Sequence, residues 1–236
     1  MGIQCVILAG GLGTRMRPST ETIPKALLPV CGEPFVDHQL RWLSSHGVAE
    51  VVLSIGHLGQ LLREHVGDGG RFGLRVRYVD EGEELRGTAG ALRLALEEGA
   101  LAPDFLLTYG DSYLPVDFGA FARAFERSDA PAMMAVYRNL ERWDQSNVVV
   151  SGARVVLYDK HHKGPALRME YIDYGLSGLR RAVVEERVPP GAKADLADLL
   201  HALSVEGQLA AYEVSTRFYE IGSPQGLADL EHFLVA

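Results

Sequence analysis

Cysteine is scarce in this chain: only two occur in 236 residues. Cys5 falls in a predicted buried strand and Cys31 in a predicted loop. A disulfide framework needs several cysteines, and a metal site needs them at short, regular spacings. These two therefore indicate free thiols in a reducing compartment, and we expect a cytoplasmic protein.

Long apolar runs and an excess of positive charge are also missing. No stretch approaches the roughly 20 apolar residues of a membrane-spanning helix, and no signal-peptide pattern opens the sequence. Lysine and arginine number 23 against 31 acidic residues, a net charge of −8, and the basic residues are dispersed. We therefore expect neither a membrane nor a nucleic acid as a partner.

The composition that remains suits one large globular domain. Hydrophobic residues make up 47% of the chain, which is enough for a sizeable core. The length does not force a division, since a domain usually takes roughly 100–200 residues. Residues 1–236 are therefore expected to form a single domain.

The periodicity of the apolar residues alternates between two types. Short apolar runs predict buried strands at residues 5–8, 51–54, 74–79, 105–108 and 132–136. Helical spacing predicts helices between them at residues 35–45, 59–65, 89–96 and 118–125. This alternation indicates an α/β protein with a Rossmann-like, mostly parallel sheet that is covered by helices on both faces.

The pattern changes after residue 140. Residues 148–150, 155–158 and 169–176 read as strands joined by short polar turns, which predicts a small antiparallel excursion. Helices resume at residues 194–204 and 224–233. Trp42 and Trp143 are predicted to be packing residues rather than stacking platforms.

The most informative motif follows the first predicted strand. Residues 8–15 read Leu-Ala-Gly-Gly-Leu-Gly-Thr-Arg, and residues 24–30 read Pro-Lys-Ala-Leu-Leu-Pro-Val. Glycine lets the backbone approach a ligand closely and adopt positive φ, so successive N–H groups can point at phosphate oxygens. Arg15 offers a planar fork of donors and Lys25 a point charge, and both suit a polyphosphate. The motif predicts a nucleoside triphosphate site whose loop residues are Ala9, Gly10, Gly11, Gly13 and Thr14.

Two common glycine-rich nucleotide motifs do not fit this segment. A P-loop closes with Gly-Lys-Ser/Thr, which Gly13-Thr14-Arg15 does not supply, and a dinucleotide fingerprint needs a third glycine where Met16 stands. A turn without a ligand accounts for the glycines alone. It does not account for Arg15 and Lys25 in a long segment that prolines stiffen.

A carboxylate follows the fourth predicted strand. Asp111 comes directly after the apolar run at 105–108 and the turn residues Tyr109 and Gly110. In sheets of this kind ligands collect at the carboxyl ends of the strands, and Mg²⁺ prefers one or two carboxylates with phosphate oxygens and water. The alternative is a turn aspartate bonded to its own backbone. We expect Asp111 to bind Mg²⁺ next to the phosphates.

Together the motifs resemble those of the sugar-1-phosphate nucleotidyltransferases. The pattern Gly-Gly-x-Gly-Thr-Arg-x-x-Pro-x-Thr-x-x-x-Pro-Lys-x-Leu-x-Pro-Val begins at Gly10. In chain order there follow Gly87-Thr88-Ala89-Gly90-Ala91-Leu92, Tyr109-Gly110-Asp111, Asp159-Lys160 and Ile221-Gly222-Ser223-Pro224. The resemblance covers nearly the whole chain. It implies an enzyme that joins a nucleoside triphosphate to a sugar 1-phosphate, with Arg15, Lys25 and Asp111 as catalytic residues.

The same resemblance assigns residues to the metal and to the sugar phosphate. Relatives usually carry an aspartate before the Gly-Ser/Thr-Pro segment as a second metal ligand, and Glu220 stands there. The family's lysine for the sugar phosphate corresponds to Lys160, although His161 replaces the usual proline. An ordinary surface lysine is the alternative. The expected contacts to the sugar are Asn147, Asp159 and Asp173.

Two segments are expected to face the nucleobase. The turn Gly87-Thr88-Ala89-Gly90 precedes a helical run, and its backbone N–H groups and small surface can receive a flat base. Glu81 falls near the position where relatives read the base, whereas Glu83 and Glu84 read as a solvated charge run. A carboxylate only accepts hydrogen bonds, which favours guanine, then uracil or thymine. GTP is therefore the favoured substrate, with UTP or dTTP as alternatives.

The motifs are similar to those of the short, single-domain members of the family. These include guanylyltransferases for D-glycero-D-manno-heptose 1-phosphate and uridylyltransferases for N-acetylmuramate 1-phosphate. The heptose type, with GDP-heptose as product for cell-surface polysaccharide, is the expectation. A non-catalytic module of the same fold stays open as the alternative, because Glu220 replaces the aspartate. A kinase is disfavoured by the missing Gly-Lys-Ser/Thr element, and the relatives imply a homo-oligomer.

Overall fold

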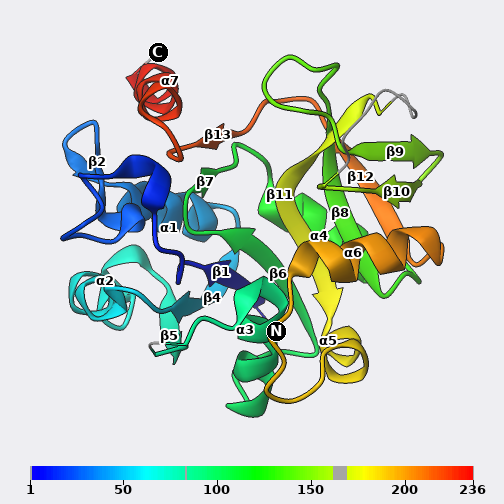
Figure 1. Ribbon diagram of the computed structural model, residues 1–236, viewed down its shortest axis with the longest axis horizontal. Coiled ribbons are helices and arrows are strands. Elements are labelled where there is room, and N and C mark those ends of the chain that lie inside the picture. Colours follow the sequence, from blue (N-terminus) through cyan, green and yellow to red (C-terminus); the bar gives the residue numbers. More distant parts are fainter. Residues whose placement is uncertain (1, 83, 162–168, 236) are drawn as a thin grey trace.

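The computed structural model of the chain describes residues 2–82, 84–161 and 169–235. A nine-stranded sheet runs through it in the order β5-β4-β1-β6-β11-β8-β12-β10-β9 (Figure 1). Its strands, in chain order, are β1 (Ile3–Leu8), β4 (Val48–Ile55), β5 (Arg75–Asp80), β6 (Asp104–Tyr109), β8 (Ala132–Arg138), β9 (Val148–Ser151), β10 (Arg154–Tyr158), β11 (Tyr171–Arg180) and β12 (Leu209–Val214).

Helices cover both faces of this sheet. Three pack on one face: α1 (Phe35–Ser45), α2 (Gly59–Val66) and α4 (Phe118–Glu126). Three pack on the other: α3 (Gly87–Glu97), α5 (Arg181–Arg187) and α6 (Leu196–Val205). Each helix buries one stripe of side chains because apolar residues recur at helical spacing. In α4 this stripe consists of Phe118, Phe121 and Phe125.

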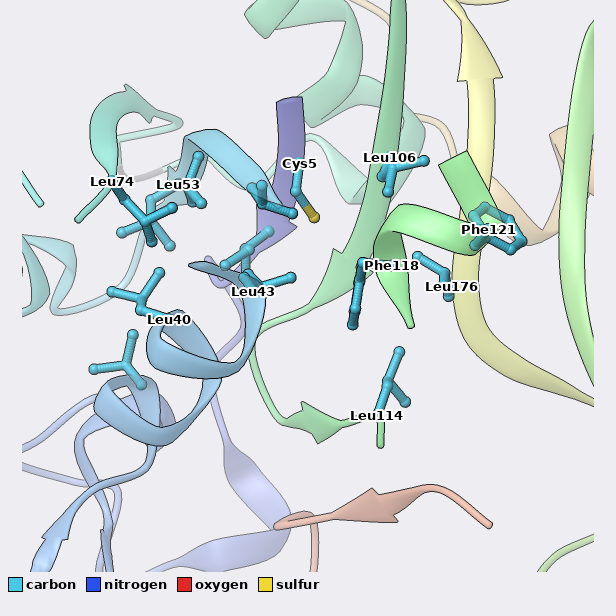
Figure 2. Close-up of a cluster of buried hydrophobic side chains, with 14 of the residues drawn as sticks. Cys5, Leu40, Leu43, Leu53, Leu74, Leu106, Leu114, Phe118, Phe121 and Leu176 are labelled. Atoms are coloured by element: carbon cyan, nitrogen blue, oxygen red, sulfur yellow. The ribbon is translucent and has the colours of Figure 1, made fainter. Parts of the chain in front are cut away.

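Strand alternation divides the core into two layers. In β1, Cys5 points to the layer under α1, α2 and α4, and the next residue, Val6, points to the layer under α3, α5 and α6. Successive strand residues face opposite sides, so both positions must be apolar when both faces are covered. Figure 2 shows the first layer, where Leu40 and Leu43 of α1 lie near Cys5 of the sheet.

The first half of the sheet confirms the predicted parallel arrangement. β1 lies parallel to β4 on one side and to β6 on the other, and β4 lies parallel to β5. In the β1–β6 pair Leu8 lies opposite Tyr109. The two strand ends that lead to the glycine-rich loop and to Asp111 are therefore neighbours.

The antiparallel part is larger than the small excursion predicted after residue 140. β11 is inserted between β6 and β8 and runs antiparallel to both, and only β9 and β10 form an edge hairpin. The sheet is therefore mixed. The sequence could not show this, because an apolar run reports burial and not which strands lie beside it. The prediction also missed α5 and β12.

Two pairs of short strands and the last helix form a small substructure beside the sheet. β7 (Ser112–Tyr113) pairs antiparallel with β13 (Tyr219–Glu220), and β2 (Pro29–Val30) pairs with β3 (Glu33–Pro34). The C-terminal helix α7 (Pro224–Val235) lies away from the sheet (Figure 1). It packs through Leu230 in a third apolar cluster with Tyr113 and Val30.

Both cysteines are free thiols, as predicted. Cys5 is buried in β1, and Cys31 is exposed between β2 and β3. Burial raises the pKa of the Cys5 thiol far above its ordinary value, so it stays in its unreactive thiol form. Among the described residues, no helix has the length and apolar character to cross a membrane.

Candidate active site

A pocket opens at the carboxyl ends of β1 and β6, beside the start of α3. Its lining includes most residues predicted for the nucleotide and for catalysis, namely Ala9, Gly10, Gly11, Gly13, Lys25, Glu81, Gly87, Thr88 and Asp111. Thr14 and Arg15 are not among the lining residues; both lie in the short helix η1 (Thr14–Met16). Segments far apart in the sequence thus converge on one concave surface, as ligand sites commonly require.

The glycine-rich loop is shaped by its own backbone. Gly13 has a φ of +61°, a value that favours glycine. The carbonyl oxygen of Gly13 accepts the Thr20 hydroxyl at 2.8 Å. At Gly10 a Cβ would lie 2.6 Å from Oε1 of Glu81, whereas at Gly11 a Cβ would meet no atom within 4 Å. The loop is therefore close-packed at Gly10 and open at Gly11, where a phosphate group could approach it.

Lys25 and Asp111 form an ion pair in the wall of the pocket. Lys25 lies in the short helix η2 (Lys25–Leu27), and its Nζ is 2.8 Å from Oδ2 of Asp111. Their side chains are only 14% and 25% exposed, so water screens the pair weakly. The predicted catalytic lysine and the predicted metal-binding aspartate thus lie in direct contact.

A buried glutamine holds the loop that carries Asp111. Nε2 of Gln39, in α1, donates to the carbonyl oxygens of Tyr109 at 2.8 Å and of Ser112 at 2.9 Å. These two carbonyls flank Asp111, so the glutamine fixes the backbone on both sides of it. Sequence reasoning missed Gln39, because it belongs to no motif and only the fold brings it to this loop.

The short strand β13 brings Glu220 next to Asp111. Glu220 pairs with Ser112 in the β7–β13 ladder, and the N–H of Ile221 donates to the carbonyl oxygen of Asp111 at 3.0 Å. The charge of Asp111 acts on the Glu220 carboxyl. Two carboxylates from distant parts of the chain therefore lie close together, with Asp111 in the pocket lining and Glu220 beside it.

The surroundings of Glu220 favour its protonated form. Part of the residue is exposed to solvent, yet protein atoms crowd its carboxyl. This burial, followed by the negative charge of Asp111, raises the pKa of Glu220 to about 7, while Arg15 and Lys25 oppose the rise. A divalent cation between the two carboxylates would relieve their repulsion.

The pair of carboxylates fits Mg²⁺ rather than a metal held by protein alone. Among the described residues no group of three or more metal-ligating side chains occurs. Mg²⁺ commonly takes one or two carboxylates and completes its six ligands with phosphates and water. Asp111 and Glu220 are therefore the residues that could hold it.

Arg15 lies outside the pocket lining but close to this pair. Its guanidinium packs on Gly222, where a Cβ would lie 3.2 Å from Nη2 of Arg15. Its positive charge lowers the pKa of Glu220 against the effect of burial. Arg15 is exposed, so its guanidinium faces solvent at the rim of the site.

Glu81 lines the pocket where its side chain meets the glycine-rich loop. Its Oε1 lies at Gly10, and its Oε2 accepts the N–H of Arg86 at 2.8 Å. Burial raises the pKa of Glu81, and the backbone hydrogen bond and the positive charge of Arg86 oppose the rise. Oε2 thus holds the segment before α3 through Arg86, and Oε1 lies against Gly10 in the lining of the pocket.

Gly87 and Thr88 begin α3 and lie against a later segment of the chain. At Gly87 the φ is +74°, and a Cβ would lie 2.6 Å from the carbonyl oxygen of Ala194. The same carbonyl accepts the N–H groups of Ala89 at 3.0 Å and Gly90 at 3.2 Å. Those two N–H groups are therefore already bonded, which corrects the expectation that the whole turn could receive a base.

The predicted sugar contacts gather in a second cluster. Oδ1 of Asn147 accepts the N–H of Asp173 at 2.9 Å, and the carbonyl oxygen of Asn147 accepts the N–H of Asp159 at 2.9 Å. Asp173 lies at an irregularity of β11, where Gly175 donates its N–H to Oδ1 of Asp173 at 2.9 Å. Burial raises the pKa of Asp173, and hydrogen bonds from Gly175 and Tyr158 oppose the rise.

Lys160 lies between this cluster and Asp195. Its charge acts on the carboxyls of both Asp173 and Asp195. Asp195 caps α6 by accepting the N–H of Ala197 at 2.9 Å, and it accepts the Thr88 hydroxyl at 2.9 Å. Burial alone would raise the pKa of Asp195, but these bonds and the charge of Lys160 outweigh it and lower the pKa.

Tyr109 connects the pocket with the cluster around Asp173. It lines the pocket, and the charges of Asp173, Asp195 and Asp111 all act on it. Burial first, and these carboxylates next, raise the pKa of Tyr109 well above its ordinary value. Sequence reasoning missed Tyr109 and Asp195. Two features of the sequence could have identified them. Tyr109 stands at the end of a strand directly before Gly-Asp, and Asp195 is a potential capping residue before a helical run.

Comparison with known proteins identifies relatives over most of the chain. The family described as nucleotidyl transferase matches residues 4–147. The UTP–glucose-1-phosphate uridylyltransferase of Synechocystis sp. is 28% identical over 229 residues, which are 92% of this chain and 58% of that protein. The N-acetylmuramate alpha-1-phosphate uridylyltransferase of Neisseria meningitidis is 37% identical over 118 residues, 50% of this chain and 51% of that protein. The chain thus spans little more than half the length of these curated relatives.

The fold also matches solved structures. HddC from Yersinia pseudotuberculosis superposes with a TM-score of 0.78 at 22% sequence identity, and the match covers 99% of this chain and 100% of that one. At this level of identity the similarity shows the fold, which agrees with the mixed sheet and its two helical layers.

Proposed function

The chain belongs to the nucleotidyl transferase family, and we propose that it transfers a nucleotidyl group from a nucleoside triphosphate to a sugar 1-phosphate and releases pyrophosphate. The observation that carries this proposal is the meeting of Lys25, Asp111 and Glu220 beside a glycine-rich pocket. A cationic side chain, two carboxylates that can hold a metal ion, and accessible backbone N–H groups at one place suit the binding of a triphosphate.

The reaction needs no nucleophilic side chain. A phosphate oxygen of the sugar 1-phosphate attacks the α-phosphorus of the nucleotide, the bond from that phosphorus to the bridging oxygen breaks, and pyrophosphate leaves with the electron pair. The obstacle is repulsion between two polyanions, so positioning and charge neutralisation are the main contributions of the protein. Bound Mg²⁺ would neutralise charge on the phosphates.

Each cationic side chain has a position that suits one part of this task. Lys25 lines the pocket and can move from Asp111 to a phosphate oxygen of the nucleotide. Arg15, at the rim, suits the outgoing pyrophosphate. Lys160 lies among the sugar-site carboxylates, where it suits the phosphate of the sugar. The two phosphate groups can then meet near Tyr109, where the pocket and the sugar cluster adjoin.

For the nucleobase we propose a G, U or T nucleotide, with GTP favoured. Glu81 lines the pocket and accepts hydrogen bonds only. Guanine presents two adjacent donors to a carboxylate, uracil and thymine present one, and the corresponding cytosine nitrogen is an acceptor. UTP is the main competing nucleotide, because two relatives are named as uridylyltransferases.

For the sugar we propose a heptose 1-phosphate, by similarity to the short guanylyltransferases. Asn147, Asp159 and Asp173 lie together at the sugar end and offer mainly hydrogen-bond acceptors. A polyhydroxylated sugar supplies the donors that such acceptors need. N-acetylmuramate 1-phosphate is the second candidate, because one relative is named for it.

A non-catalytic nucleotide-binding module is the competing function. The observation that favours it is Glu220 in place of aspartate, a longer side chain whose raised pKa weakens it as a metal ligand at neutral pH. Pyrophosphate release, measured with Mg²⁺, five nucleoside triphosphates and a panel of sugar 1-phosphates, separates the two. The proposal expects one nucleotide and one sugar to react, whereas nucleotide binding with no pyrophosphate from any pair would favour the module.

A further inference from the structure

Glu220 reaches Asp111 on a strand that has little to hold it. β13 consists of two residues, and within the described part of the chain it pairs only with the equally short β7. A pair of this length is marginal by itself. The buried Ile221 after β13 also donates its N–H to the carbonyl oxygen of Asp111. Mg²⁺ tolerates little error in the position of its ligands, so further contacts on the other end of this strand matter.

Arg217, just before β13, is stacked between two aromatic rings. Its guanidinium carbon lies 3.6 Å from the ring centroid of Trp143 and 4.5 Å from that of Tyr219. On the far side Tyr219 stacks on Phe233 of α7, with ring centroids 4.6 Å apart. Nη2 of Arg217 also donates to Oδ2 of Asp229 in α7 at 3.1 Å. One arginine thus contacts β13, α7 and the loop that carries Trp143.

The loop that supplies Trp143 is held by hydrogen bonds from a buried asparagine. Asn139 is fully buried, and its Oδ1 accepts the N–H of Trp143 at 3.1 Å. Its Nδ2 donates to the carbonyl oxygen of Asp144 at 2.6 Å and to the Ser146 hydroxyl at 3.0 Å. The loop is therefore a firm support, although Trp143 itself is 47% exposed and packs on a cation rather than in the core.

The stack and the metal-binding carboxyl lie on opposite sides of β13. Consecutive residues of a strand point to opposite faces, so Tyr219 faces the arginine while Glu220 faces Asp111. Holding Tyr219 from behind therefore fixes the direction of Glu220. Since Arg and Trp make favourable cation–π contacts that a lysine matches less well, the planar guanidinium suits this role.

We infer that Arg217 is a positioning residue: by clamping β13 between Trp143 and α7 it holds Glu220 where it can share a divalent cation with Asp111. The inference rests on the proposed function in one respect only, namely the role of the bound cation in the reaction. Arg217 and Trp143 are not among the lining residues of the pocket, and in this inference both act through the strand that carries Glu220.

Binding of Mn²⁺ to the intact protein tests this without any turnover. Electron paramagnetic resonance measures the free Mn²⁺ as protein is titrated. Arg217→Lys, which keeps the charge but loses the planar stack, and Trp143→Ala are each expected to weaken Mn²⁺ binding about ten-fold, the usual effect of losing support behind a ligand. Arg142→Lys makes the same change at an exposed arginine of the loop that carries Trp143, so it should stay within about two-fold of wild type.

The outcomes separate this inference from the proposed function. Equal Mn²⁺ affinity in wild type, Arg217→Lys and Trp143→Ala, or no Mn²⁺ binding by wild type, overturns the role of Arg217. Weakened Mn²⁺ binding in these two variants, with normal thermal unfolding and with Arg142→Lys unaffected, supports it. If wild type binds Mn²⁺ in this way but releases no pyrophosphate, the proposed function fails and the role of Arg217 stands.

Discussion

Nζ of Lys25 lies 2.8 Å from Oδ2 of Asp111, with both side chains largely withdrawn from water. Each charge offsets the cost of burying the other. A polyphosphate with its cation can replace both interactions at once, since its oxygens accept from Lys25 while the cation takes Asp111. The ion pair therefore holds both side chains in place, and binding of a polyphosphate with its cation would separate them.

Removal of either partner of this pair is expected to abolish most of the activity. Lys25→Ala and Asp111→Ala should each reduce turnover at least about 100-fold, the usual cost of one group that stabilises developing charge. Pyrophosphate release measures the loss, and circular dichroism checks that the fold is kept. Arg127→Ala, an exposed position at the end of α4, is the control and should behave as wild type; turnover near normal in Lys25→Ala would contradict the mechanism.

Glu81 is expected to set the choice of nucleotide. Glu81→Gln keeps the size and the acceptor for the N–H of Arg86, but it replaces one acceptor by an amide donor. The preference for GTP over CTP, measured as the ratio of kcat/KM values, should fall about ten-fold, which corresponds to the loss of one hydrogen bond. Glu84→Gln, on the exposed part of the same loop, is the matched control. An unchanged ratio in Glu81→Gln would remove Glu81 from base recognition.

Glu220 is expected to make stability depend on pH. Its folded pKa of about 7 lies above the ordinary 4.5, so the folded chain holds this proton more tightly than the unfolded chain. The stabilising contribution is therefore complete below about pH 4.5 and is lost as the pH rises through about 7.

Glu220→Gln removes that loss because glutamine does not ionise. We compare the free energy of unfolding of the variant with that of wild type at each pH. This difference should favour the variant by about 1 kcal/mol more at pH 8 than at pH 5, and it is small because solvent screens a partly exposed group. Urea unfolding at both pH values, with a chelator present, gives the difference. The same relative stability at pH 5 and pH 8 would show that Glu220 titrates normally.

Gly90→Ala is expected to destabilise the protein although it lies inside a helix. Alanine usually stabilises a helix interior by up to about 1 kcal/mol relative to glycine. At Gly90, however, a Cβ would lie 2.6 Å from the carbonyl oxygen of Ala192, so the segment after α5 must move. We expect a loss of about 1–3 kcal/mol, measured by urea unfolding. Gly11→Ala, where a Cβ meets nothing within 4 Å, should leave stability unchanged; stabilisation by Gly90→Ala would contradict the close approach.

The sequence predicted those parts of the protein that depend on local pattern. The strands at β1, β4, β5 and β6 follow from apolar runs, and α1 was predicted with both of its ends correct. The glycine-rich loop and Asp111 were each predicted to follow a strand at the carboxyl edge of the sheet, and the structure shows that these two strands, β1 and β6, are neighbours. What remained hidden were relationships across the chain, such as β11 between β6 and β8.

The same distinction applies to the site. The spacing of a motif identifies Lys25 and Asp111, but it cannot show that Gln39 holds the loop around Asp111 or that Tyr109 connects the pocket with the cluster around Asp173. Trp143 was predicted as a packing residue, and the structure places it half exposed on Arg217. Such contacts join side chains to segments as far apart in sequence as Gln39 and Ser112, which no local pattern encodes.

The most direct test of the central claim is pyrophosphate release by the wild-type protein with Mg²⁺, in which GTP, UTP, dTTP, CTP and ATP are each paired with sugar 1-phosphates that include the heptose. The account predicts release with one nucleotide and one sugar, formation of the corresponding nucleoside diphosphate sugar, and loss of both in Asp111→Ala. Release that persists undiminished in Asp111→Ala, or tight nucleotide binding with no release from any pair, would contradict it.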